Sequence, residues 1–171
     1  MKNLVLIGLS GCGKSTFGRR LARRLHVPFL DTDTMIEEKA GKTITDIFSE
    51  DGEKYFRDLE SACAQEASAM QGAVISTGGG MILRPENMAC LAKNALIVFI
   101  DRHPSHILSS TFLTDRPLVQ NNRERLFKLY KERLNTYRRY ADVTIPNYGG
   151  PRTLKSRILQ VLRHYRRSNI S

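Results

Sequence analysis

The sequence feature that most constrains the fold is a glycine-rich segment at residues 8–15, Gly-Leu-Ser-Gly-Cys-Gly-Lys-Ser. It matches the pattern G-x-x-x-x-G-K-[ST], follows an apolar run at 4–7 and leads into a helical pattern at 14–25. A strand, a glycine-rich turn and a helix in this order predict a P-loop, whose backbone N–H groups surround phosphate oxygens at a positive helix N-terminus. We expect Lys14 to reach the outer phosphates of a nucleotide and the Ser15 hydroxyl to ligate Mg²⁺.

Within this loop, Cys12 has two interpretations. It is either a small residue at a position that the motif leaves free, or a thiol activated by the helix N-terminus. The pattern favours the first, because the motif specifies no residue type at that position.

Short apolar runs recur along the whole chain. The runs at 4–7, 28–30, 73–75, 96–100 and 143–145 are nearly continuous, which is typical of strands buried on both faces. Helical patterns lie at 14–25, from Thr34 with a Thr34/Glu37 capping box, at 53–70, at 123–140 and at about 153–167. This alternation predicts an α/β fold around a five-stranded parallel sheet. The 171 residues suit one domain, 1–171, at roughly 150 residues per domain.

Two segments depart from this alternation. Residues 33–72 are helical without a strand and exceed what one crossover needs, so we interpret them as a helical substrate-binding insertion. Residues 109–122 are polar, lack helical periodicity and contain the Arg116-Pro117 step, which disfavours helix at Arg116. We expect this second segment to form a lid.

Composition excludes several classes of protein. The net charge of +10 and pI of about 9.9 predict a polyanionic partner or small anionic ligands, and charge alone does not choose between them. The apolar runs are far shorter than the roughly 18 residues of a membrane-spanning helix, and no signal peptide is apparent. Three cysteines without a Cys-x-x-Cys pair suggest neither disulfides nor zinc. We therefore expect a cytoplasmic protein.

Two further segments carry candidate site residues at strand ends. Asp31 and Asp33 follow the second apolar run, where ligands of open α/β sheets gather. One carboxylate can support a metal while the other accepts the proton of an attacking hydroxyl; the alternative is an N-cap for the next helix. The segment that begins with the third apolar run, at 73–75, ends in three glycines at 78–80. Glycines allow the backbone to approach a ligand closely.

Arginines also occur where a solvated helix face does not explain them. Arg133 lies on the apolar stripe of the 123–140 helix, and Arg57 lies beside Phe56 with Glu60 three residues on, close enough to orient its guanidinium. Together with Arg116 in the expected lid, these arginines suggest clamps for carboxylate and phosphate groups.

The motifs of this chain are similar, in order and over nearly its whole length, to those of one family. They are the P-loop, Asp31-Thr32-Asp33, Phe48, Phe56-Arg57 with Glu60, 76–80, Arg116-Pro117-Leu118, Arg133-Leu134 with Tyr137, and Ala141-Asp142. On these residues the chain resembles the shikimate kinases. The resemblance implies a three-layer, P-loop nucleoside monophosphate kinase-like fold. It also implies transfer of the ATP γ-phosphoryl group to the 3-hydroxyl of shikimate, in aromatic amino acid biosynthesis.

The resemblance also implies a role for each candidate residue. Asp33 would bind the shikimate hydroxyls and act as base, and Arg57 and Arg133 would hold the carboxylate. Ser15 would ligate Mg²⁺, with Asp31 supporting it through water. The remaining substrate-pocket residues would be Phe48, Phe56, Glu60, Gly78, Gly79 and Gly80. The nucleotide-binding residues would be Gly11, Cys12, Gly13, Lys14, Ser15, Thr16, Arg116 and Arg152, with Lys14, Asp33 and Arg116 catalytic and Arg152 beside the adenine.

The lid shows one departure from the family. Family members commonly have an Arg-Thr pair at its start, whereas this chain has Ser109-Ser110-Thr111, which affects the expected adenine contact. Two other functions stay open at this point. A gluconate-type sugar-acid kinase would also need a P-loop and a carboxylate clamp, and the basic tail at 163–167 would suit a P-loop module that binds nucleic acid. We expect shikimate and ATP as partners, no nucleic acid or membrane, and a monomer.

Overall fold

A parallel five-stranded sheet organises the molecule. The computed structural model describes residues 1–109, 123–149 and 151–169, without the side chains of Pro151 and Arg152. The strand order is β2-β3-β1-β4-β5, and every strand pair is parallel. The strands are β1 (Asn3–Ile7), β2 (Phe29–Asp31), β3 (Val74–Ser76), β4 (Ala95–Asp101) and β5 (Val143–Pro146).

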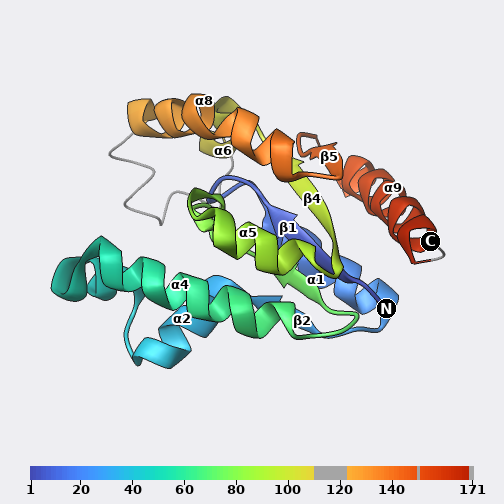
Figure 1. Cartoon of the computed structure of the whole chain (residues 1–171). Coiled ribbons are helices and arrows are strands. Elements are labelled where there is room, and N and C mark those ends of the chain that lie inside the picture. The colour runs from blue at the N-terminus through green and yellow to red at the C-terminus, as the bar shows by residue number, and fades with distance from the viewer. Residues whose placement is uncertain (110–122, 150, 170–171) are drawn as a thin grey trace.

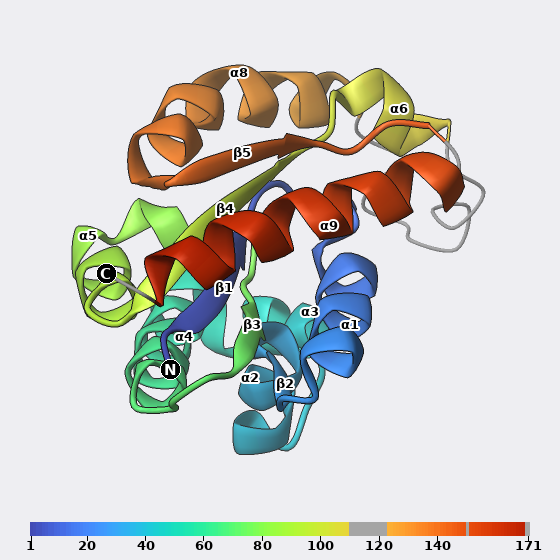
Figure 2. The same ribbon diagram turned by 90° about the vertical axis from the view of Figure 1, so that its right-hand side faces the viewer.

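Helices cover the sheet on both faces (Figures 1 and 2). The helices α1 (Lys14–Leu25) and α9 (Pro151–Ser168) pack against each other and against the strands on one face. On the other face lie α5 (Pro85–Ala92) and α8 (Arg123–Tyr140), while α4 (Gly52–Ser68) packs beside α5. The arrangement confirms the expected three-layer α/β fold. Among the described residues, no helix is both long and apolar enough to cross a bilayer.

The burial of the strands explains their apolar composition. All five residues of β1, all three of β3 and the central five of β4 are buried, because helices cover both faces. The predicted helices at 14–25 and 123–140 have the expected bounds. Sequence analysis missed α5 and α6 (Pro104–Leu108), although each has proline at a first helical position, which is a helix-start signal.

The expected helical insertion consists of several elements. It contains α2 (Thr32–Ala40), α3 (Ile44–Asp46), the π-helical turn η1 (Ile47–Asp51) and α4, and the 3-10 turn η2 (Met81–Leu83) follows β3. The insertion has its own small core, separate from that of the sheet. The fully or nearly fully buried members of this core are Ile36, Ile47, Phe56 and Cys63.

The predicted Thr34/Glu37 capping box is wrong. The α2 helix begins two residues earlier, because Asp31 is its N-cap and accepts a hydrogen bond from the backbone N–H of Asp33 at 3.2 Å. Glu37 instead accepts a hydrogen bond from the backbone N–H of Ile44 at 3.0 Å, which ties α2 to α3. This hydrogen bond confirms the alternative interpretation of Asp31 as a helix cap.

The Asn3 side chain secures the start of β3. Its buried amide donates to the Met70 carbonyl at 2.7 Å and accepts from the Ala73 N–H at 3.0 Å, which fixes the entry to β3. Asn3→Ala leaves both backbone groups without their partner and should lower the free energy of unfolding by about 2 kcal/mol. Urea denaturation measures this change. The exposed Asn94→Ala is the control, with an expected change within about 0.5 kcal/mol; an equal loss in both variants would contradict the assignment.

Candidate active site

The P-loop connects β1 to α1 and encloses the Lys14 ammonium group. Lys14 Nζ donates hydrogen bonds to the carbonyl oxygens of Gly8 and Leu9, each at 2.8 Å, and lies 3.8 Å from Cys12 Sγ. Both Lys14 and Cys12 are buried. The Cys12 side chain packs inside the loop, in line with its interpretation as a small loop residue. Gly13 is the N-cap of α1 and supplies no side-chain cap, which leaves this helix N-terminus open to an anion.

Asn147, which follows β5, supports the P-loop from outside. Its Nδ2 donates to the Cys12 carbonyl at 2.7 Å, and a Cβ at Gly13 would lie 2.7 Å from the same nitrogen. Arg157 of α9 in turn donates to Asn147 Oδ1 at 3.3 Å. Sequence analysis missed Asn147, and its place at the end of a predicted strand was the only signal for it.

Oxygen donors from three elements meet beside the P-loop. Ser15 Oγ donates to Asp31 Oδ2 at 2.6 Å and lies 3.4 Å from Ser76 Oγ, at the end of β3. Hydroxyl and carboxylate oxygens are the hard ligands that Mg²⁺ prefers, so these residues fit the ion. The described residues contain no cluster of three His, Cys, Asp or Glu side chains that could hold a metal ion alone. In proteins, Mg²⁺ usually keeps several waters and binds substrate phosphates as well as side-chain oxygens.

Asp33 lies in the first turn of α2, close to this group. Burial and then the neighbouring charge of Asp31 raise the pKa of Asp33 to about 6, although the positive charge of Lys14 opposes the shift. A Cβ at Gly78 would lie 2.7 Å from Asp33 Oδ1, so only glycine permits this approach. Asp33 is thus a carboxyl group poised to change protonation near neutral pH.

Side chains from several helices lie next to the glycines 78–80. The Gly78 N–H donates to Thr32 Oγ1 at 3.0 Å, and a Cβ at Gly80 would lie 2.7 Å from the Arg57 guanidinium carbon. The Gly79 carbonyl accepts hydrogen bonds from Arg133 Nη1 at 3.0 Å and from Tyr137 Oη at 2.6 Å. Arginines from α4 and α8 therefore approach the same loop as Asp33.

Glu60 orients the Arg57 guanidinium, as its spacing predicts. Arg57 Nη1 lies 2.7 Å from Glu60 Oε2, and the Glu60 side chain is 1% exposed. Burial raises the pKa of Glu60, against the lowering effects of Arg57, Arg133 and Arg84. The other carboxylate oxygen, Oε1, is buried without a hydrogen-bond partner in the described part of the chain. A buried acceptor of this kind points to a ligand donor.

Aromatic rings border the arginine. The Phe48 and Phe56 rings lie 4.6 Å apart between centroids, and the Arg57 guanidinium carbon lies 5.0 Å from the centre of the Phe56 ring. Phe48 is 40% exposed, so its ring forms an apolar wall at the surface.

Arg84 is a second residue that sequence analysis missed. It donates to the Arg57 carbonyl at 3.0 Å and pairs with Asp58 at 2.8 Å, and so fastens α4 next to the site. No sequence pattern distinguished it, because its partners Arg57, Asp58 and Ser61 lie 23 to 27 residues away in the chain.

Some predicted site residues lie outside the described part of the structure or have no described side chain. The expected lid, 109–122, lies outside the described residues except for Ser109, which is exposed, and Arg116 lies outside them as well. The backbone of Arg152 belongs to the first turn of α9, but its side chain is not described. Thr16 is exposed in the first turn of α1, and Gly11 has a positive φ of 79° in the P-loop.

Comparisons with known proteins agree with this geometry. The family model "Shikimate kinase" matches residues 10–163. A shikimate kinase of Clostridium botulinum (strain Eklund 17B / Type B) is 44% identical over 148 residues, which cover 86% of this chain and 89% of that protein. A shikimate kinase of Clostridium beijerinckii is 45% identical over 148 residues, with 86% and 87% covered.

Solved structures are similar throughout. The shikimate kinase from Acinetobacter baumannii in complex with shikimate has a TM-score of 0.89 and 33% identity, covering 100% of this chain and 96% of that one. The shikimate kinase from Bacteroides thetaiotaomicron has a TM-score of 0.85 and 28% identity, covering 96% and 98%. Three findings agree: the family model covers most of the chain, the relatives are more than 40% identical, and the fold is shared. This chain belongs to the shikimate kinase family.

Proposed function

We propose that this chain transfers the γ-phosphoryl group of ATP to the 3-hydroxyl group of shikimate, giving shikimate 3-phosphate and ADP. Family membership makes it an ATP-dependent kinase. The observation that carries the choice of substrate is the convergence of Asp33, Arg57 and Arg133 on glycines 78–80, next to the P-loop. A carboxylate that can accept a hydrogen bond from a hydroxyl, with two guanidinium groups around the same loop, suits a small substrate that has both hydroxyl and carboxylate groups.

The two arginines would bind the substrate carboxylate. Their guanidinium groups come from two separate helices, α4 and α8, and would together fix the orientation of a small anion. Glu60 holds Arg57 in place, and its free Oε1 is available to accept a hydrogen bond from a substrate hydroxyl. Phe48 and Phe56 provide an apolar wall for the carbon ring.

Asp33 would accept a hydrogen bond from the attacking hydroxyl and take its proton. Its carboxylate lies next to Gly78 and is influenced electrostatically by Lys14. Phosphoryl transfer depends mainly on positioning and on stabilising charge. Lys14 would supply positive charge to the outer phosphates, and Arg116 would add charge from the lid.

Mg²⁺ would neutralise negative charge on the ATP phosphates. Ser15 would hold the ion directly and Asp31 would hold it through water, since their oxygens already lie 2.6 Å apart. The P-loop residues Gly11–Ser15, with Thr16, would bind the phosphates, and Arg152 would border the adenine. We also propose that the chain acts as a monomer, as a single domain with a helical insertion and a lid, in the cytosol.

Substrate choice is tested by ADP release from Mg-ATP with the purified protein. We expect release with shikimate, and only background release with gluconate, with a nucleoside monophosphate or without an acceptor. A coupled assay for ADP measures the rate, and mass spectrometry identifies the product. Equal release with gluconate would overturn the proposed substrate and retain the P-loop assignment.

Asp33 is tested by the pH dependence of the reaction. Its reactive form is the carboxylate, so kcat/KM for shikimate should rise about tenfold per pH unit below pH 6 and level off above it. Asp33→Asn should lower kcat by about 10² to 10⁴ while leaving ATP affinity within about twofold. The exposed Glu38→Gln on the same helix should keep both the rate and the profile.

The raised pKa of Asp33 also predicts the folding stability of the Asp33→Asn variant, which distinguishes a loss of catalysis from a loss of folding. Because the folded state raises the pKa of Asp33, folding is favoured when this group is protonated, and that stabilisation is lost as pH rises through about 6. Asp33→Asn should therefore be at least as stable as the parent at pH 8. A loss of stability together with a loss of ATP binding would contradict the catalytic assignment.

The carboxylate clamp is tested by Arg133→Lys. A lysine keeps the charge but cannot form the planar two-point contact with a carboxylate. We expect KM for shikimate to rise about tenfold or more, with KM for ATP within about twofold. Arg138→Lys, five residues along α8 and 55% exposed, is the matched control. Equal increases in both KM values for Arg133→Lys would show that this arginine does not bind the carboxylate selectively.

A further inference from the structure

The positive charge of this chain is concentrated on two helices. The sequences of α1 and α9 contain eleven of the 27 Lys and Arg residues and none of the 17 Asp and Glu residues. The rest of the chain has sixteen basic and seventeen acidic residues, a net charge of −1. The binding of ATP and shikimate therefore does not account for the charge of +10, because most of these cations lie away from the site.

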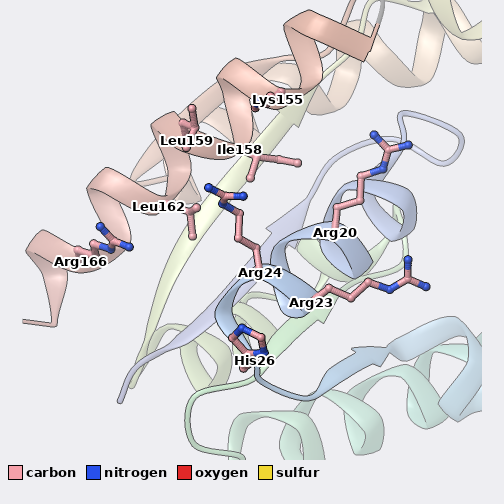
Figure 3. Close-up of a pocket in the computed structure, with 9 residues that line it drawn as sticks. All are labelled: Arg20, Arg23, Arg24, His26, Lys155, Ile158, Leu159, Leu162 and Arg166. Atoms are coloured by element: carbon pink, nitrogen blue, oxygen red, sulfur yellow. The ribbon is translucent and has the colours of Figure 1, made fainter.

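The two helices enclose a groove on the outer side of the sheet. Its volume is about 800 Å³, and its basic residues are Arg20, Arg23 and Arg24 of α1 and Lys155 and Arg166 of α9. Figure 3 shows Arg24 reaching from α1 towards α9. Within the part of the chain that the structure describes, none of these five side chains has a hydrogen bond or an ion pair. Five unpaired cations around one groove repel each other and favour an anionic ligand.

The floor of the groove is aliphatic. Ile158, Leu159 and Leu162 line it, and Figure 3 shows Ile158 and Leu162 directed towards α1. Leu159 is 37% exposed, which leaves an apolar contact surface between the cations. The one aromatic ring in the lining is the imidazole of His26, and no Phe, Tyr or Trp side chain lies there on which successive bases could stack. A ligand that uses the whole groove therefore needs both negative charge and aliphatic side chains.

We propose that the groove between α1 and α9 binds an acidic amphipathic helix of a partner protein. A groove between two helices accepts a third helix through apolar anchors spaced at i, i+3, i+4 and i+7. The anchors would contact Leu159 and its neighbours, and flanking Asp or Glu residues would pair with Arg24 and Arg166. Electrostatic complementarity would accelerate the encounter and select acidic partners.

The proposed site is separate from the active site. The P-loop lies at the start of α1, whereas Arg20, Arg23 and Arg24 belong to its second half. None of the residues that line the groove is among the candidate catalytic or substrate-binding residues. The inference therefore does not depend on the proposed function.

Fluorescence anisotropy with a labelled synthetic peptide tests the proposal. The probe is an acidic peptide of about 16 residues with leucines along one helical face and glutamates elsewhere. A scrambled peptide of the same composition and a duplex RNA of similar charge are the comparisons. We expect the amphipathic peptide to bind about tenfold more tightly than the scrambled one, since only the first presents a continuous apolar face.

Paired variants locate the binding site. The double variant R24E/R166E should weaken peptide binding about tenfold. The double variant K93E/R163E makes the same change in net charge at exposed positions outside the groove and should stay within about twofold. Equal losses in the two double variants would overturn the proposal, because they would show attraction to net charge alone.

The apolar contact has its own variant. Leu159→Ser should weaken peptide binding several-fold and leave RNA binding unchanged, whereas Leu83→Ser, at another exposed leucine, should change neither. Tighter binding of RNA than of peptide, unaffected by Leu159→Ser, would replace the proposal with a nucleic-acid site. All variants should retain the ADP release of the parent protein, which shows that they are folded and that a negative binding result concerns the groove alone.

Sedimentation velocity separates a partner protein from a second copy of this chain. Residues 32–68 contain ten acidic and four basic residues, so another copy could present an acidic surface to the groove. We expect the parent protein to sediment as one species at micromolar concentration. Self-association that R24E/R166E abolishes would assign the groove to a second copy and overturn the proposal.

Discussion

The site depends on one constraint. Four parts of the chain approach a single loop that has no side chains. Glycines 78–80 follow β3, and each has a different neighbour where a Cβ would be: Asp33 at Gly78, the Ser10 backbone at Gly79 and Arg57 at Gly80. A side chain at any of these positions would separate the P-loop from the helical insertion. The short distance between phosphate-binding and substrate-binding groups therefore follows from backbone packing.

The sequence predicted the parts of this arrangement whose signals are local. The apolar runs located all five strands, because strands covered on both faces need continuous apolar residues. Arg133 was found because a cation on an apolar helical stripe requires a partner, here the Gly79 carbonyl. Asn147 and Arg84 were not found, because their roles depend on partners that only the folded chain brings near. The start of α2 was misplaced because Asp31 serves as helix cap and as partner of Ser15 at once.

The net charge of the sequence does not show how its charge is distributed. The value of +10 predicted a polyanionic partner or small anionic ligands, and the helices α1 and α9 carry all of the excess. Around the active site the balance is different, since Asp33 and Glu60 lie among Lys14, Arg57 and Arg133. Burial raises the pKa of both carboxyl groups, which means that folding works against their charged forms. The site keeps these groups at a cost in stability, as is common for functional residues.

The groove and the P-loop share their structural supports. The helix α1 is about 18 Å long at 1.5 Å per residue, with the P-loop at its start and the groove along its second half. The other wall, α9, reaches the P-loop through Arg157, which holds Asn147, which in turn holds the Cys12 carbonyl. A ligand in the groove would affect nucleotide binding only if it bound one arrangement of α1 and α9 more tightly than another. A ligand with equal affinity for both arrangements does not shift the equilibrium between them. The hydrogen bonds from Arg157 to Asn147 and from Asn147 to Cys12 are the physical connection through which such a preference would act.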